Sequence, residues 1–113
     1  MNLFSNDQEG RVSYNRNILT SIIALAAEEV DGVASVYKNG KNKNKTGVKI
    51  DFEKDGVYVD VSVKVYSGYT VPDVAVNIQE NVKRGVETMT DYKVKNINVS
   101  VLDVIFANEV IED

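Results

Sequence analysis

The fold is decided by one stretch, VYVDVSVKVY at positions 57–66, in which valine occupies every second position. Successive side chains of a β-strand point to opposite faces of its sheet, so the five valines share one face. Tyrosine, aspartate, serine and lysine occupy the other face. The stretch therefore predicts a strand with one face on a hydrophobic core and one polar face.

A second strand is expected directly before it, at 48–54, where Val48, Ile50 and Phe52 share a face. Asp55-Gly56 lies between the two stretches, and this dipeptide favours a two-residue type I′ hairpin turn. The two strands are therefore expected to pair antiparallel.

The first expected helix begins at Arg16, after Asn15 as N-cap, and ends before Gly32. Its apolar residues cover more than half of the circumference, so it must be covered on more than one side. They are Ile18, Leu19, Ile22, Ile23, Leu25, Ala26, Ala27 and Val30.

Three acidic residues, Glu28, Glu29 and Asp31, fall in the last turn of this helix, where the helix dipole disfavours anions. Two interpretations stay open: an acidic binding site, or a solvated helix end.

The second expected helix starts near Pro72, which suits the first helical position, with Asp73 at the positive end of the dipole. One apolar seam runs along it, formed by Val74, Ile78, Val82, Val86 and Met89. Gly85 inside this helix costs about 1 kcal/mol relative to alanine, which a close contact with another element would justify.

The last expected strand, 94–106, changes phase within its length. Ile97, Val99 and Val101 are apolar at odd positions, whereas Leu102, Val104 and Phe106 are apolar at even positions. A one-residue shift turns the buried face over, so a β-bulge is one interpretation. The other is that Leu102, Val104 and Phe106 form an apolar patch that binds a partner.

A short strand at 10–14 and an extended segment at 33–37 complete the expected elements. The predicted fold is α+β, with two helices on one face of a mostly antiparallel sheet and the order β-α-β-β-α-β. A flexible lead-in at 1–9, one domain at 10–106 and an acidic tail at 107–113 make up the expected organisation. The other face of the sheet is polar, and no expected element covers it.

The composition argues against catalysis. The 113 residues include no histidine and no cysteine, which removes the commonest general base, the commonest metal ligand and the thiol nucleophile. Carboxylates such as Asp51 and Asp60 fall on the polar sheet face, where a charged surface is the better interpretation. We expect no enzyme, no catalytic residue, no metal site and no cofactor.

The absence of cysteine fits a reducing compartment, and the longest apolar run, at 22–27, is far too short to span a membrane. We therefore expect a soluble, cytoplasmic chain without a signal peptide or a transmembrane segment. The net charge of −4 disfavours nucleic acid as a partner. One alternative remains, a small RNA- or anion-binding module. It would use Lys41, Lys43 and Lys45 in a lysine-rich loop, together with Tyr58 and Tyr66 on the exposed sheet face.

Several segments together resemble the alkaline shock protein family of Gram-positive bacteria, over nearly the whole chain. They are AAEEVDGVASV at 26–36, VKI at 48–50, VPDVA at 71–75, IQENVK at 78–83 and VKNINV at 94–99. Arg16 stands where the family often has proline, and the long charged tails of larger members are missing, as in a short housekeeping-type member.

The resemblance implies a non-enzymatic adaptor in cell-envelope homeostasis or stress response. It implies self-association and a protein partner that is membrane-anchored or acts in lipid metabolism, which would place the chain at the membrane periphery. Leu102, Val104 and Phe106, with Tyr58 and Tyr66, are the expected partner contacts.

Overall fold

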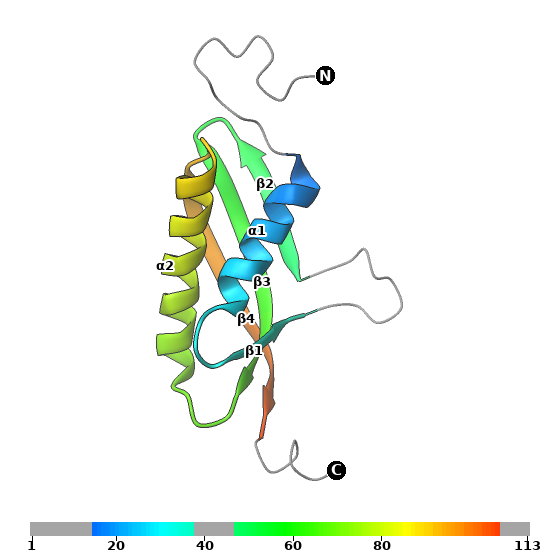
Figure 1. Ribbon diagram of the computed structural model, residues 1–113, viewed down its shortest axis with the longest axis vertical. Coiled ribbons are helices and arrows are strands. Elements are labelled where there is room, and N and C mark those ends of the chain that lie inside the picture. Colours follow the sequence, from blue (N-terminus) through cyan, green and yellow to red (C-terminus); the bar gives the residue numbers. More distant parts are fainter. Residues whose placement is uncertain (1–14, 38–46, 107–113) are drawn as a thin grey trace.

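The computed structural model describes residues 15–37 and 47–106, which form two helices and four strands (Figure 1). In chain order these are α1 (Arg16–Glu28), β1 (Val33–Val36), β2 (Val48–Glu53), β3 (Gly56–Tyr66), α2 (Val71–Met89) and β4 (Val94–Ile105). The expected strand at 10–14 lies outside the described residues, and the segment expected to be extended at 33–37 supplies β1.

β3 is the central strand of the sheet. β4 pairs with it in parallel from Val57 to Tyr66. β1 and β2 pair with it antiparallel and follow one another along the opposite edge, β2 against 56–61 and β1 against 63–65. The predicted fold class is therefore confirmed: two of the three strand pairs are antiparallel, and both helices lie on one face (Figure 1).

The core lies between that face and the helices. All five valines of β3 are at most 1% exposed. The helices meet them with Leu19 and Ile23 from α1, and with Ile78 and Val82 from α2. No polar or charged residue among those described is buried, so hydrophobic burial dominates the stability of this layer.

The hairpin forms where it was expected, but its turn is one residue earlier. Glu53 pairs with Gly56, which leaves Lys54 and Asp55 as the turn residues, so the predicted Asp55-Gly56 turn is wrong. Gly56 is instead the first residue of β3, with φ 145°. Its amide neighbour Val57 donates to the Lys93 carbonyl at 2.7 Å, and a Cβ on Gly56 would collide with that carbonyl.

Helix boundaries follow the predicted caps with small corrections. The Asn15 side chain accepts from the Ile18 amide at 2.9 Å, which confirms the N-cap. α1 ends at Glu28, before the expected Asp31, because a turn reaches β1 through Gly32 at φ 97°. α2 begins one residue before Pro72, with Thr70 as N-cap.

The change of phase in the last strand is a β-bulge, as one of the two interpretations predicted. Val101 pairs with Val63, and Asp103 pairs with Lys64, so Leu102 is the additional residue. Beyond the bulge, Val104 lies opposite the fully buried Val65 and packs against the core.

The helices approach closely at Gly85. A Cβ added there would meet only the Cβ of Ala26, at 3.6 Å, which is ordinary van der Waals contact. Beside it, Asn81 Nδ2 of α2 donates to the Ala26 carbonyl of α1 at 2.6 Å. The close contact expected at Gly85 is present, yet it leaves room for a methyl group.

We therefore predict that Gly85→Ala raises the free energy of unfolding by up to about 1 kcal/mol, because alanine removes the helix penalty of glycine without a clash. Chemical denaturation measures the change. Gly56→Ala is the contrasting variant and should lower stability, since its backbone conformation and the Lys93 carbonyl both exclude a side chain. A destabilised Gly85→Ala variant would contradict the helix packing.

Candidate functional site

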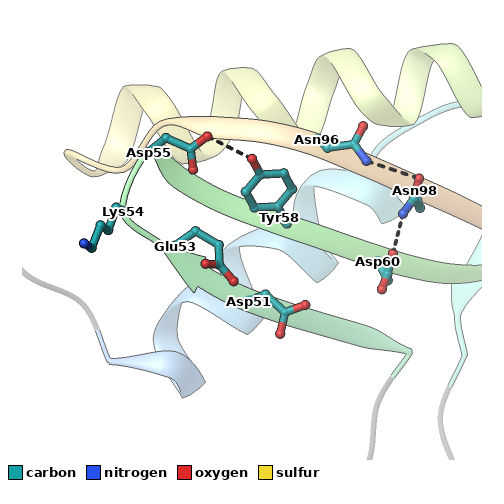
Figure 2. Close-up of a pocket in the computed structure, with 8 residues that line it drawn as sticks. All are labelled: Asp51, Glu53, Lys54, Asp55, Tyr58, Asp60, Asn96 and Asn98. Atoms are coloured by element: carbon teal, nitrogen blue, oxygen red, sulfur yellow. Dashed lines mark hydrogen bonds between the residues drawn. The ribbon is translucent and has the colours of Figure 1, made fainter.

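The polar face of the sheet is not covered by any described element, and its hairpin end carries a shallow hollow of about 640 Å³ (Figure 2). Side chains from β2, β3, β4 and the hairpin turn line it. They are Asp51, Glu53, Lys54, Asp55, Tyr58, Asp60, Asn96 and Asn98.

Three hydrogen bonds organise this hollow (Figure 2). The Tyr58 hydroxyl donates to Asp55 Oδ2 at 2.9 Å. Asn98 Nδ2 donates to Asp60 Oδ1 at 2.8 Å and thereby joins β4 to β3, while Asn96 Nδ2 donates to Asn98 Oδ1 at 3.4 Å. The bonds form two groups, one joining β3 to the hairpin turn and the other joining β3 to β4.

The carboxylates that line this hollow lie on an open surface. Asp51 pairs with Tyr58 and Asp60 pairs with Lys49, so the two aspartates are diagonal neighbours on the same face. Within 15–37 and 47–106, no group of three or more histidine, cysteine or acidic side chains is arranged to hold a metal ion. The hydrogen bond to Asp55, with smaller effects of desolvation and of the charges of Asp55 and Glu53, raises the pKa of Tyr58.

Exposed apolar side chains lie toward the opposite end of the sheet. Leu102 is 53% exposed and Phe106 49%, and Tyr66, at the end of β3, is 43% exposed. The bulge gives Val104 a different environment from Leu102, because Val104 lies on the core side opposite Val65. Tyr58 lies eight residues from Tyr66 along β3, about 26 Å away in an extended strand.

The structure therefore groups only part of the predicted partner site. Tyr66, Leu102 and Phe106 lie toward one end of the sheet, whereas Tyr58 belongs to the polar hollow at the other end. Lys41, Lys43 and Lys45 lie outside the described residues.

Sequence reasoning missed a set of side chains that cap the edges of the sheet. On β4, Gln79 Nε2 of α2 donates to the Ile97 carbonyl at 2.8 Å, and Glu87 Oε2 accepts from the Val94 amide at 2.8 Å. Asp103 Oδ1 accepts from the amide of Val104 at 2.9 Å.

The strands on the other edge are capped from α1. Arg16 Nη1 donates to the Ile50 carbonyl of β2 at 2.6 Å, and its guanidinium lies 5.0 Å from the centre of the Phe52 ring. Glu28 Oε2 accepts from the Val36 amide of β1 at 3.1 Å. Glu28 thus also caps a strand, a role that neither interpretation of the acidic helix end included.

A family model of cell envelope-related function, ASP23, matches residues 5–106. The chain belongs to the ASP23 family. The resemblance to the alkaline shock proteins is thereby confirmed.

Curated relatives agree with this assignment. The chain is 33% identical over 106 residues to the uncharacterized protein YqhY of Bacillus subtilis (strain 168), covering 86% of this chain and 78% of YqhY. It is 30% identical over 105 residues to a stress response regulator gls24 homolog of Streptococcus pyogenes serotype M3, covering 84% of this chain and 59% of that protein. The chain thus spans little more than half of the gls24 homolog.

Solved structures share the fold of this ASP23 family member. The copper form of MamM CTD matches with a TM-score of 0.52 and 22% identity, over 78% of this chain and 85% of that chain. A MamM CTD in its nickel form matches with the same TM-score and identity, over 77% and 96%. In the part of the chain that the structure describes, neither helix is long and apolar enough to cross a bilayer.

The hydrogen bond between Tyr58 and Asp55 leads to a prediction about the pKa of Tyr58. Asp55→Ala should lower the pKa of Tyr58 toward its ordinary value, because both the hydrogen bond and the nearest negative charge are removed. The ring carbon resonances of Tyr58, followed by NMR through an alkaline titration, measure it.

Asp51→Ala is the matched control, since Asp51 pairs with Tyr58 across the hairpin while the hydroxyl donates to Asp55 instead. An equal drop in both variants, or none in Asp55→Ala, would show that this hydrogen bond does not form in solution.

Proposed function

We propose that this ASP23 family member is a non-enzymatic adaptor in cell-envelope homeostasis, which associates with itself and binds a membrane-associated or lipid-metabolism protein. The family model supports the envelope context. The observation that carries the adaptor role is the apolar end of the sheet, where Tyr66, Leu102 and Phe106 are each between 43% and 53% exposed.

Exposed apolar side chains that gather at one place favour protein contact. Large aromatic and aliphatic side chains provide most of the binding energy at protein interfaces when a partner excludes water from them. Leu102 is held out of the core by the bulge, and the Ser67 amide fixes the strand end through a 2.8 Å bond to the Ile105 carbonyl. The patch is therefore presented on ordered backbone.

The polar hollow supports a binding surface better than a catalytic one. Acid–base catalysis by paired carboxylates needs a site that excludes water and separates their pKa values. Here Asp51, Glu53 and Asp55 are exposed on an open sheet face. The absence of histidine and cysteine from the whole sequence points in the same direction.

The alternative, an RNA- or anion-binding module, has less support. Its lysines lie outside the described residues, and the tyrosine nearest to an open polar surface, Tyr58, stands among four carboxylates. Those carboxylates would repel a phosphate backbone.

The test is a crosslinked capture of the tagged chain from its native cells, with membrane and soluble fractions analysed separately. We expect an integral membrane protein or a lipid-synthesis enzyme, and at least a tenfold lower recovery with the double variant Leu102→Ser/Phe106→Ser.

The matched control replaces two equally exposed apolar residues on the helix layer, as Leu25→Ser/Met89→Ser, which should capture normally. Unchanged capture by the Leu102/Phe106 variant, or equal loss in both variants, would refute the patch as the partner site.

A further inference from the structure

β4 has one unpaired edge, and its backbone groups can be assigned to that edge one by one. In a strand the N–H and C=O of one residue point to the same side, and the side alternates along the chain. The Lys93 and Ile105 carbonyls bond to the Val57 and Ser67 amides, so both point inward. The side-chain caps on Val94, Ile97 and Val104 mark outward positions.

Counting from these fixed points through the two register shifts gives one consistent pattern. The outward residues are Val94, Ile97, Val99, Val101 and Val104. Three of these five positions carry a capped group, and no side chain or loop among the described residues bonds the outward groups of Val99 and Val101. The edge is therefore blocked at its ends and open in its middle.

We propose that a second copy of this chain pairs antiparallel with β4 through this window, with a two-fold axis at Ser100, so that two sheets join into one. In this register Val99 of each copy faces Val101 of the other, and each facing pair exchanges two backbone hydrogen bonds. The proposal rests on the self-association that the proposed function includes, and it names the surface.

The capped groups identify the occupant as a second copy. Leu102 and Asp103 together oppose one residue, so the two-fold axis brings Ile97 of one copy against Val104 of the other. In this register the Ile97 carbonyl of one copy would face the Val104 amide of the other. Both groups already bond to capping side chains, so neither is left unsatisfied. An unrelated strand would instead bury an unsatisfied donor and an unsatisfied acceptor, which costs free energy.

β2 offers no comparable window. Its cap falls on Ile50, in the middle of a six-residue strand, and the guanidinium of Arg16 and the ring of Phe52 stack beside it. β4 is twice as long, and within it Val99 and Val101 lie between the capped positions Ile97 and Val104. Long edges with free backbone groups are templates for pairing with another chain.

The helix layer adds an apolar contact to the same junction. Val76 lies three residues before Gln79, so it occupies the helix flank that reaches the β4 edge. Val76 is 49% exposed. Joining two copies through β4 sets the two α2 helices side by side on one face, where Val76 of each copy becomes covered.

A charge swap at the axis tests the proposal. Ser100 is exposed on the open face, and the two-fold axis brings its Cα about 4.5 Å from that of the other copy. Ser100→Lys and Ser100→Glu should each weaken the dimer at least tenfold, because like charges then face each other. An equal mixture of the two variants should dimerise again, which also shows that both variants fold.

Sedimentation velocity over a concentration series reads out the mass, with the monomer at 12.5 kDa. Asn96→Lys is the control, because Asn96 is exposed on the same face of β4 but the axis does not bring it against its own copy. This variant should dimerise like the wild type.

A dimer that survives both Ser100 substitutions overturns the edge pairing and leaves self-association through another surface. A wild-type chain that stays monomeric at every concentration overturns the edge pairing and the self-association together. Neither result changes the capture test at Leu102 and Phe106, so failure of the partner site is recognised separately.

Discussion

The burial of β3 is the constraint on which the rest of the structure depends. Its five valines are at most 1% exposed, and both of its edges are paired with other strands. A strand whose one face must leave water needs a layer above it, and α1 and α2 provide that layer with apolar stripes. Because β3 occupies the centre, every other strand in the described sheet becomes an edge.

An edge strand exposes backbone N–H and C=O groups on its unpaired side, and long polar side chains of the helices bond to several of them. Arg16 and Glu28 reach from α1 to β2 and β1, and Gln79 and Glu87 reach from α2 to β4. Each bond satisfies a backbone group that would otherwise invite pairing with another chain. The caps thus close parts of each edge, and the uncapped middle of β4 underlies the dimer that we propose.

Much of the fold could be predicted from the sequence, because it depends on local periodicity. The valine alternation, the Asn15 cap and the phase change before Leu102 are each visible within a few residues. The hairpin turn was misplaced by one residue because the reason for Gly56 is a carbonyl from Lys93, 37 positions away. Long-range backbone contacts of this kind leave no local pattern.

The candidate sites were predicted less well, for the same physical reason. Tyr58 and Tyr66 alternate correctly on one face, yet the length of the strand separates them, and the bulge moves Val104 to the core side. The edge caps are ordinary surface residues in the sequence, since a glutamate that bonds a distant amide looks like a solvated one. Only the packing of the helices on the sheet reveals their partners.

Residue-resolved amide hydrogen exchange along β4, at low and at high protein concentration, tests this account most directly. The inward amides of Asn98 and Ser100 should exchange slowly at both concentrations. Those of Val99 and Val101 should exchange quickly in dilute solution and slowly in concentrated solution, where the second copy covers them. Slow exchange at Val99 and Val101 in dilute solution, or exchange that does not depend on concentration, would contradict an edge that is open in its middle and closed by self-pairing.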